Sequence, residues 1–92
     1  MMPTSSVIRM PQRFDYSSGP EFNQAMSSQP FGHNIVLDCS DMDYIDSAGL
    51  GLLLIAHHRL QDSDTRIMLC GLKATPRKII EMANIQEYID IE

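Results

Sequence analysis

Ser47 is the residue of this sequence that is best placed for chemistry. It lies in the segment DYIDSAGLGLL (residues 43–53), just ahead of a leucine run that predicts a helix. A helix start offers unpaired backbone N–H groups and the positive end of the helix dipole, so a phosphate on Ser47 would be held there. Serine is also a preferred N-cap, as is the neighbouring Asp46. The residues alone leave two interpretations open, a helix cap or a phosphorylated hydroxyl.

The other polar side chains near this segment lack the spacing of a metal site. Four aspartates are found there: Asp38, Asp41, Asp43 and Asp46. They lack the rest of a calcium-loop pattern, so a solvated loop is favoured over a metal cluster. His57 and His58 are adjacent and therefore point about 100° apart on a helix, unlike the i,i+4 pair of a helical zinc site. We expect neither a metal nor a cofactor.

The inventory of reactive groups argues against an enzyme. The sequence has no nucleophile elbow, no phosphate loop and no paired acid and base. Cys39 and Cys70 are too few for a disulfide scaffold and lack metal-ligand spacing, so we expect buried free thiols. The cations Lys73, Arg77 and Lys78 open a predicted helix, where a solvated face is favoured over a phosphate contact.

Composition and charge restrict the class of partner. The 92 residues suffice for one domain, and 43% of them are hydrophobic, as in a globular protein. The net charge of −5 argues against direct binding of nucleic acid, which needs clustered Lys and Arg. We see no secretory signal and no apolar stretch of about 18 residues, so we expect a cytoplasmic protein without membrane insertion.

Strands and helices alternate along the chain and must together position Ser47. We expect strands at residues 7–14, 35–37, 66–70 and 88–91, and helices at 19–28, 48–61 and 75–83. Ser18 and Glu21 form a capping-box pattern, and Thr75 followed by Pro76 marks a second helix start. The runs at 35–37 and 66–70 are typical of strands buried on both faces. The alternation predicts one α/β domain at residues 7–92 with a largely parallel sheet, after a flexible N-terminus at 1–6.

A helical projection divides the predicted helix at 48–61 into two faces. Its core face holds Gly49, Leu52, Leu53, Ala56 and Leu60. Gly51, Ile55 and His58 fall on the opposite face, with Leu54 at its border. Exposed apolar side chains beside a glycine are a candidate docking surface.

These residues also resemble a known family. The segments 35–40 (IVLDCS) and 45–53 (IDSAGLGLL) look like the signature of STAS domains, and are closest to their bacterial anti-sigma factor antagonist branch. Residues 13–15, 17–22 and 66–71 also resemble elements of that family. The resemblance implies a STAS-type single domain with a mostly parallel sheet of four to five strands and about three helices. Members usually begin with a hairpin strand, whereas only six residues precede the first strand expected here.

The resemblance implies a phosphorylation switch at Ser47. The unphosphorylated protein would bind an anti-sigma factor, often a serine kinase of the histidine-kinase-like ATPase fold, and free a sigma factor. Phosphorylation would end that binding, and a metal-dependent serine phosphatase would restore it. The surface implied for the partner comprises Asp43, Asp46, Ser47, Ala48, Gly49, Leu50, Gly51, Leu54, Ile55 and His58. The alternative is a STAS module that docks without phosphorylation, as a subunit of a lipid transport system or a signalling scaffold.

Overall fold

The structure, a computed structural model, describes residues 5–29 and 33–92. Its main sheet has the strand order β1-β3-β5-β6, and every neighbouring pair is parallel. These strands are β1 (Ser5–Arg9), β3 (Asn34–Asp38), β5 (Ile67–Cys70) and β6 (Asp90–Ile91). A separate parallel ladder joins β2 (Arg13–Phe14) to β4 (Tyr44–Ile45). The expected α/β fold with a mostly parallel sheet is confirmed.

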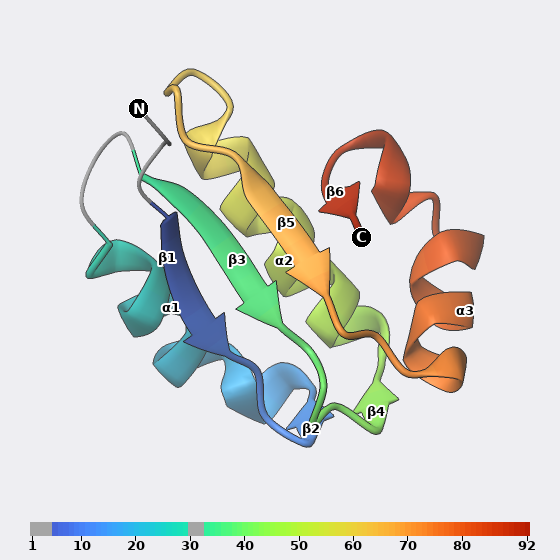
Figure 1. The fold of residues 1–92 in the computed structure, drawn as a ribbon. Coiled ribbons are helices and arrows are strands. Elements are labelled where there is room, and N and C mark those ends of the chain that lie inside the picture. The colour runs from blue at the N-terminus through green and yellow to red at the C-terminus, as the bar shows by residue number, and fades with distance from the viewer. Residues whose placement is uncertain (1–4, 30–32) are drawn as a thin grey trace.

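Three α-helices accompany the strands in the described ranges. They are α1 (Gly19–Ser27), α2 (Ser47–Leu60) and α3 (Ala74–Met82), and two short 3-10 helices follow β2 and α3, η1 (Tyr16–Ser18) and η2 (Ile85–Glu87). In Figure 1, α1 and α2 lie behind the strands, and α3 lies beyond β6 at one side. No described helix crosses the face of the sheet that is turned to the viewer. The molecule therefore has one covered and one open sheet face.

The two faces of the sheet differ in burial. Ile35, Leu37 and Leu69 point to the helices and are buried, whereas Val36 on the other face is only half-buried. Val7, on the same open face of β1, is 67% exposed. The prediction that the strands at 35–37 and 66–70 are buried on both faces is therefore wrong, because α1 and α2 cover one face only.

The first predicted strand is divided into two. β1 begins at Ser5, two residues before the expected start, and ends at Arg9. Pro11 follows in the interruption, and the chain then enters the two-residue strand β2. Residues 1–4 of the predicted flexible terminus lie outside the described residues. At the other end, the expected strand at 88–91 is reduced to β6, because η2 and a turn occupy the residues before it.

Two of the predicted helix caps are wrong. Ser18 precedes α1 without a side-chain cap; its hydroxyl instead accepts the N–H of Asp15 at 3.2 Å, in a capping box around η1. The box is therefore formed three residues earlier than expected, because the chain makes a 3-10 turn before the α-helix. The third helix begins at Ala74, so Thr75 lies inside its first turn and does not cap it.

Gly49 fixes how α2 is seated against the strands. A Cβ atom there would lie 2.3 Å from the carbonyl oxygen of Phe14 and 2.9 Å from Cγ1 of Ile45. Real Cβ atoms do not approach so closely, so only glycine lets the helix start pack onto the β2–β4 ladder. A Cβ at Gly51, half a turn further on, would meet nothing within 4 Å.

The two glycines should respond oppositely to alanine. We expect Gly49→Ala to lower the free energy of unfolding by about 1–3 kcal/mol, because the backbone of Phe14 must give way. Gly51→Ala should raise it by about 0.5–1 kcal/mol, since alanine is the better helix former and has free space. Urea denaturation of both variants measures the difference. Equal effects would contradict the close contact at Gly49.

Candidate functional site

Ser47 is exposed at the first residue of α2. The strands β1, β3 and β5 point their carboxyl ends toward the end of the molecule where β2, β4 and the start of α3 also lie (Figure 1). Ser47 follows β4 by two residues and so belongs to this end. Among the side-chain hydrogen bonds of residues 5–29 and 33–92, none involves the Ser47 hydroxyl. The hydroxyl therefore faces solvent without an internal partner in that part of the chain.

Asp46, and not Ser47, is the N-cap of α2. Its Oδ1 accepts the N–H of Gly49 at 2.9 Å, and its backbone carbonyl accepts the N–H of Leu50 at 2.9 Å. Asp46 has extended backbone angles (φ −119°, ψ −174°), the usual conformation of a cap. The amides of Ser47 and Ala48 have no acceptor among the described residues. A phosphate on Ser47 would therefore find two free amides at this helix start.

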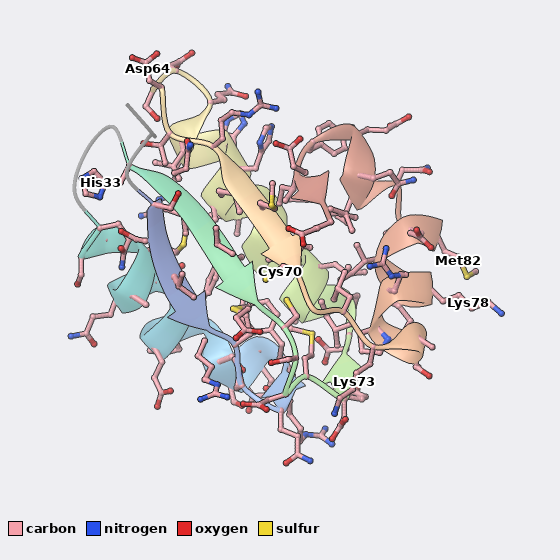
Figure 2. All side chains as sticks on the ribbon, in the orientation of Figure 1. His33, Asp64, Cys70, Lys73, Lys78 and Met82 are labelled. Carbon is pink, nitrogen blue, oxygen red and sulfur yellow. The ribbon has the colours of Figure 1, made fainter. Side chains whose placement is uncertain are left out.

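Asp43 is held in a polar cluster beside β4. It accepts hydrogen bonds from Nζ of Lys73 and, at 2.7 Å, from Nε2 of Gln12. These bonds, that from Lys73 first, hold the pKa of Asp43 below its usual range. Figure 2 shows Lys73 beside β4, whereas Lys78 points away from α3 into solvent. The sequence predicted a solvated face for Lys73 and not this contact, which joins it to a residue 30 positions away.

An aromatic and cationic rim adjoins the start of α2. The guanidinium of Arg13 lies 4.2 Å from the ring centroid of Tyr44, and its Nε lies 3.6 Å from Oδ2 of Asp15. Tyr16 is 80% exposed on η1, which packs beside α2. The sequence gives no direct signal for this rim, because Arg13 and Tyr44 meet only through the register of β2 against β4.

The outward face of α2 matches the projection closely. Leu54 (38% exposed), Ile55 (53%) and His58 are exposed, and Gly51 is half-buried beside open space. Gly49, however, is buried against Phe14 and Ile45, on the side of the helix away from this face.

Two other members of the predicted surface are partly covered. Leu50 is half-buried and packs against the core. Ala48 is half-buried at the helix start. Of the remaining predicted residues, Ser47, Gly51, Leu54, Ile55 and His58 lie on the outer side of α2. Asp43 lies before β4, and Asp46 is the N-cap of the helix.

Asp38 and Asp41 have partners close by, and the two cysteines are free thiols. Asp41 pairs with Arg9 at 3.0 Å, and Asp38 accepts the N–H of Ser40 at 3.0 Å. The described residues contain no group of three or more His, Cys, Asp or Glu side chains placed to hold a metal. Burial raises the pKa of the Cys39 thiol to about 12, so it stays protonated and unreactive at neutral pH. Cys70 is only half-buried, contrary to expectation.

The family of the chain follows from this fold and from sequence comparison. The chain has a parallel sheet covered on one side and a helix that begins at an Asp-Ser pair. The sequence profile of the STAS domain matches residues 3–92. The chain belongs to the STAS family. No helix in the described residues combines the length and apolar character that a membrane span requires.

Three known proteins illustrate what this chain is similar to. A STAS-domain containing protein of Pseudomonas aeruginosa is 26% identical over 86 residues, which cover 92% of this chain and 85% of that protein. The anti-sigma-B factor antagonist of Listeria monocytogenes is 26% identical over 80 residues, covering 85% and 70%. A sulfate transporter family protein from Wolinella succinogenes shares the fold with a TM-score of 0.79 at 12% identity, covering 90% and 69%.

Mutations can distinguish the contribution of the Asp46 cap to stability from that of the Ser47 hydroxyl. We expect Asp46→Ala to lower the free energy of unfolding by about 1 kcal/mol, because the Gly49 amide loses its acceptor. Asp46→Asn should cost less, since its amide oxygen can still accept. Ser47→Ala should change stability by less than about 0.5 kcal/mol, because its hydroxyl caps nothing. Urea denaturation tests the three variants, and a larger loss for Ser47→Ala than for Asp46→Ala would contradict the assignment.

The Lys73–Asp43 pair should be detectable through its effect on the pKa of Asp43. A carboxylate with a lowered folded-state pKa adds stability above its unfolded value of about 4, and that stability is lost as pH falls through the folded value. Lys73→Met should therefore raise the pKa of Asp43 in an NMR titration and reduce the loss of stability below about pH 4. Lys78→Met is the matched control, because Lys78 lies in α3 and points into solvent (Figure 2). An unchanged Asp43 titration in Lys73→Met would refute the pairing.

Proposed function

We propose that this STAS protein is an anti-sigma factor antagonist whose binding is switched off by phosphorylation of Ser47. In its unphosphorylated form it binds an anti-sigma factor and thereby releases a sigma factor. The similarity to the anti-sigma-B factor antagonist of Listeria monocytogenes over 85% of this chain supports the class of partner. The chain itself contributes a surface and a phosphate acceptor and performs no catalysis.

The main support for the proposal is that the helix cap and the free hydroxyl at the start of α2 belong to two different residues. Asp46 takes the cap, so the Ser47 hydroxyl keeps no internal hydrogen bond in the described structure. A kinase can therefore reach and modify it without first breaking the helix cap. Two amides without acceptors, those of Ser47 and Ala48, lie beside the point where the phosphate would be attached.

The outer face of α2 is the proposed binding surface. Ser47, Gly51, Leu54, Ile55 and His58 lie along it in helical order. Apolar contacts from Leu54 and Ile55 would supply most of the affinity, as buried apolar area does in protein interfaces. The empty space over Gly51 would let a partner's backbone approach the helix closely.

A phosphate at Ser47 would oppose binding by its charge. It adds about −1.5 to −2 charges next to Asp46 and must lose water when an interface closes over it. The nearby cations are already engaged, since Lys73 pairs with Asp43 and Arg13 with Asp15. A penalty of about 3 kcal/mol would weaken binding more than a hundredfold.

The proposal implies two further proteins. The anti-sigma factor would be a serine kinase of the histidine-kinase-like ATPase fold that modifies Ser47, and a metal-dependent serine phosphatase would reverse the reaction. All three would act in the bacterial cytoplasm. Neither enzyme requires a cofactor bound to this chain.

The alternative is constitutive docking through the same face of α2, as in a transport or scaffold subunit. The exposure of Ile55, at 53%, favours a docking role whether or not Ser47 is modified. In that case the charge at Ser47 would not control binding. The alternative therefore differs from the main proposal in its response to one substitution.

Phosphorylation and binding can be tested with one set of variants. Incubation with the cognate kinase and ATP should add one phosphate to the wild type and none to Ser47→Ala, as read by intact mass. Ser17→Ala removes an exposed serine from another helix start and should still be modified. Calorimetry should show at least a hundredfold weaker binding of the phosphorylated protein to the anti-sigma factor.

Charged substitutions then separate the two functions. Under the proposal, both Ser47→Asp and Ile55→Asp weaken binding to the anti-sigma factor. Under constitutive docking, Ser47→Asp binds as the wild type does and only Ile55→Asp loses the partner. If the mass of the wild type is unchanged after incubation with the cognate kinase, the proposed phosphorylation switch is refuted.

A further inference from the structure

The outer edge of β1 carries unpaired backbone groups. In a parallel ladder, the N–H and C=O of one residue point to the same side, and those of the next residue to the other side. Met10 N–H donates to the carbonyl of Asp38 at 2.9 Å, so the even-numbered residues of β1 face β3. The N–H and C=O groups of Ser5, Val7 and Arg9 therefore point away from the sheet. No hydrogen bond to any of these backbone groups is formed within residues 5–29 and 33–92.

This edge lacks the usual devices that prevent strand pairing. Edge strands are commonly blocked by proline, by a bulge or by charged side chains along the strand. Between Ser5 and Arg9 the strand has no proline, and its register with β3 is uninterrupted over all five residues. Its charged side chain, Arg9, turns to Asp41 at 3.0 Å. At the centre of the strand, Val7 is 67% exposed.

The same edge is open on its helix side. A groove of about 380 Å³ runs between β1 and α1, and its lining includes Ile8, Met10, Phe14 and Phe22. Met10, Phe14 and Phe22 are buried, whereas Ile8 is half-buried and is the apolar side chain of β1 that reaches the margin of the sheet on this side. Both the backbone and the side chains of this edge are suited to one more strand.

We propose that β1 pairs with β1 of a second copy of this chain, antiparallel and with Val7 on the two-fold axis. The outward groups of Val7 would then bond to those of the other Val7, as in a hydrogen-bonded antiparallel pair. Ser5 of each copy would face Arg9 of the other. The main sheet would continue from one chain into the next.

A second copy fits because the edge is complementary to itself. The two-fold axis stands normal to the sheet, so the helices of both copies stay on the same side. The two Arg9 side chains face serines and not each other, which avoids opposed like charges. On the helix side, Ile8 lies diagonal to Ile8 of the other copy, so apolar side chains meet where the two grooves join. The pairing therefore satisfies both the backbone and the side chains of the edge.

Cysteine cross-linking tests the register. The Cα atoms of a hydrogen-bonded antiparallel pair lie about 5.5 Å apart, within the range that a disulfide spans. Val7→Cys should give a covalent dimer under mild oxidation, seen as a doubled mass without reductant. Ser5→Cys alone should stay monomeric, but a mixture of Ser5→Cys and Arg9→Cys chains should cross-link. The wild type controls for Cys39 and Cys70.

The expected pattern depends on the proposed pairing alone. Failure of Val7→Cys to cross-link, or equal cross-linking of Ser5→Cys by itself, would overturn the inference. Neither result bears on Ser47, because no step of this experiment uses the phosphorylation switch. All three positions lie at exposed backbone sites, so the core of each variant is unchanged.

Sedimentation equilibrium provides a second measurement. The wild type should dimerise reversibly at physiological or higher salt, because screening reduces repulsion between two chains of charge −5. Val7→Pro removes an N–H that forms no hydrogen bond within the described chain. It should raise the dissociation constant of the dimer by about tenfold or more. Val7→Thr keeps this N–H and should behave as the wild type. A wild type that stays monomeric throughout the concentration series would also refute the proposal.

Discussion

The contact between Gly49 and the backbone of Phe14 determines the geometry of the site. With a Cβ-to-oxygen separation of 2.3 Å for any larger residue, α2 can approach the β2–β4 ladder only through a glycine. The approach places the first turn of the helix directly after β4. The side chains on the opposite side of that turn must then face solvent, since the helix has no freedom to roll. Exposure of the Ser47 hydroxyl is thus a consequence of core packing.

At the start of α2, the residue that caps the helix is not the proposed phosphate acceptor. Asp46 satisfies the Gly49 amide, so helix stability does not depend on Ser47. A residue without a structural task can gain and lose a charge while the fold stays intact. On this basis a phosphate would act on the surface that a partner meets, rather than on the helix itself. A switch of this kind requires no conformational change.

Local sequence patterns predicted the helices and strands but not the contacts between them. Periodicity identified the helices and the outward face of α2, because burial repeats every 3.6 residues in any amphipathic helix. The apolar run Ile35–Leu37 did not predict that one face of the sheet is open, because such runs occur in strands covered on one face and in strands covered on both. The Lys73–Asp43 pair joins residues 30 positions apart, and only the fold brings them together. Whether Asp46 or Ser47 caps the helix depended on a backbone angle that the sequence leaves free.

The proposed pairing of β1 and the proposed switch at Ser47 would use two separate surfaces of the domain. The edge of β1 belongs to the sheet, whereas Ser47 lies at the carboxyl end of the strands, beyond β4 (Figure 1). Antiparallel pairing through Val7 would turn the carboxyl ends of the two sheets in opposite directions. The two Ser47 residues of such a dimer would then lie at opposite ends, and each could meet a partner or a kinase on its own. Self-association through β1 and switching at α2 are therefore compatible in one assembly.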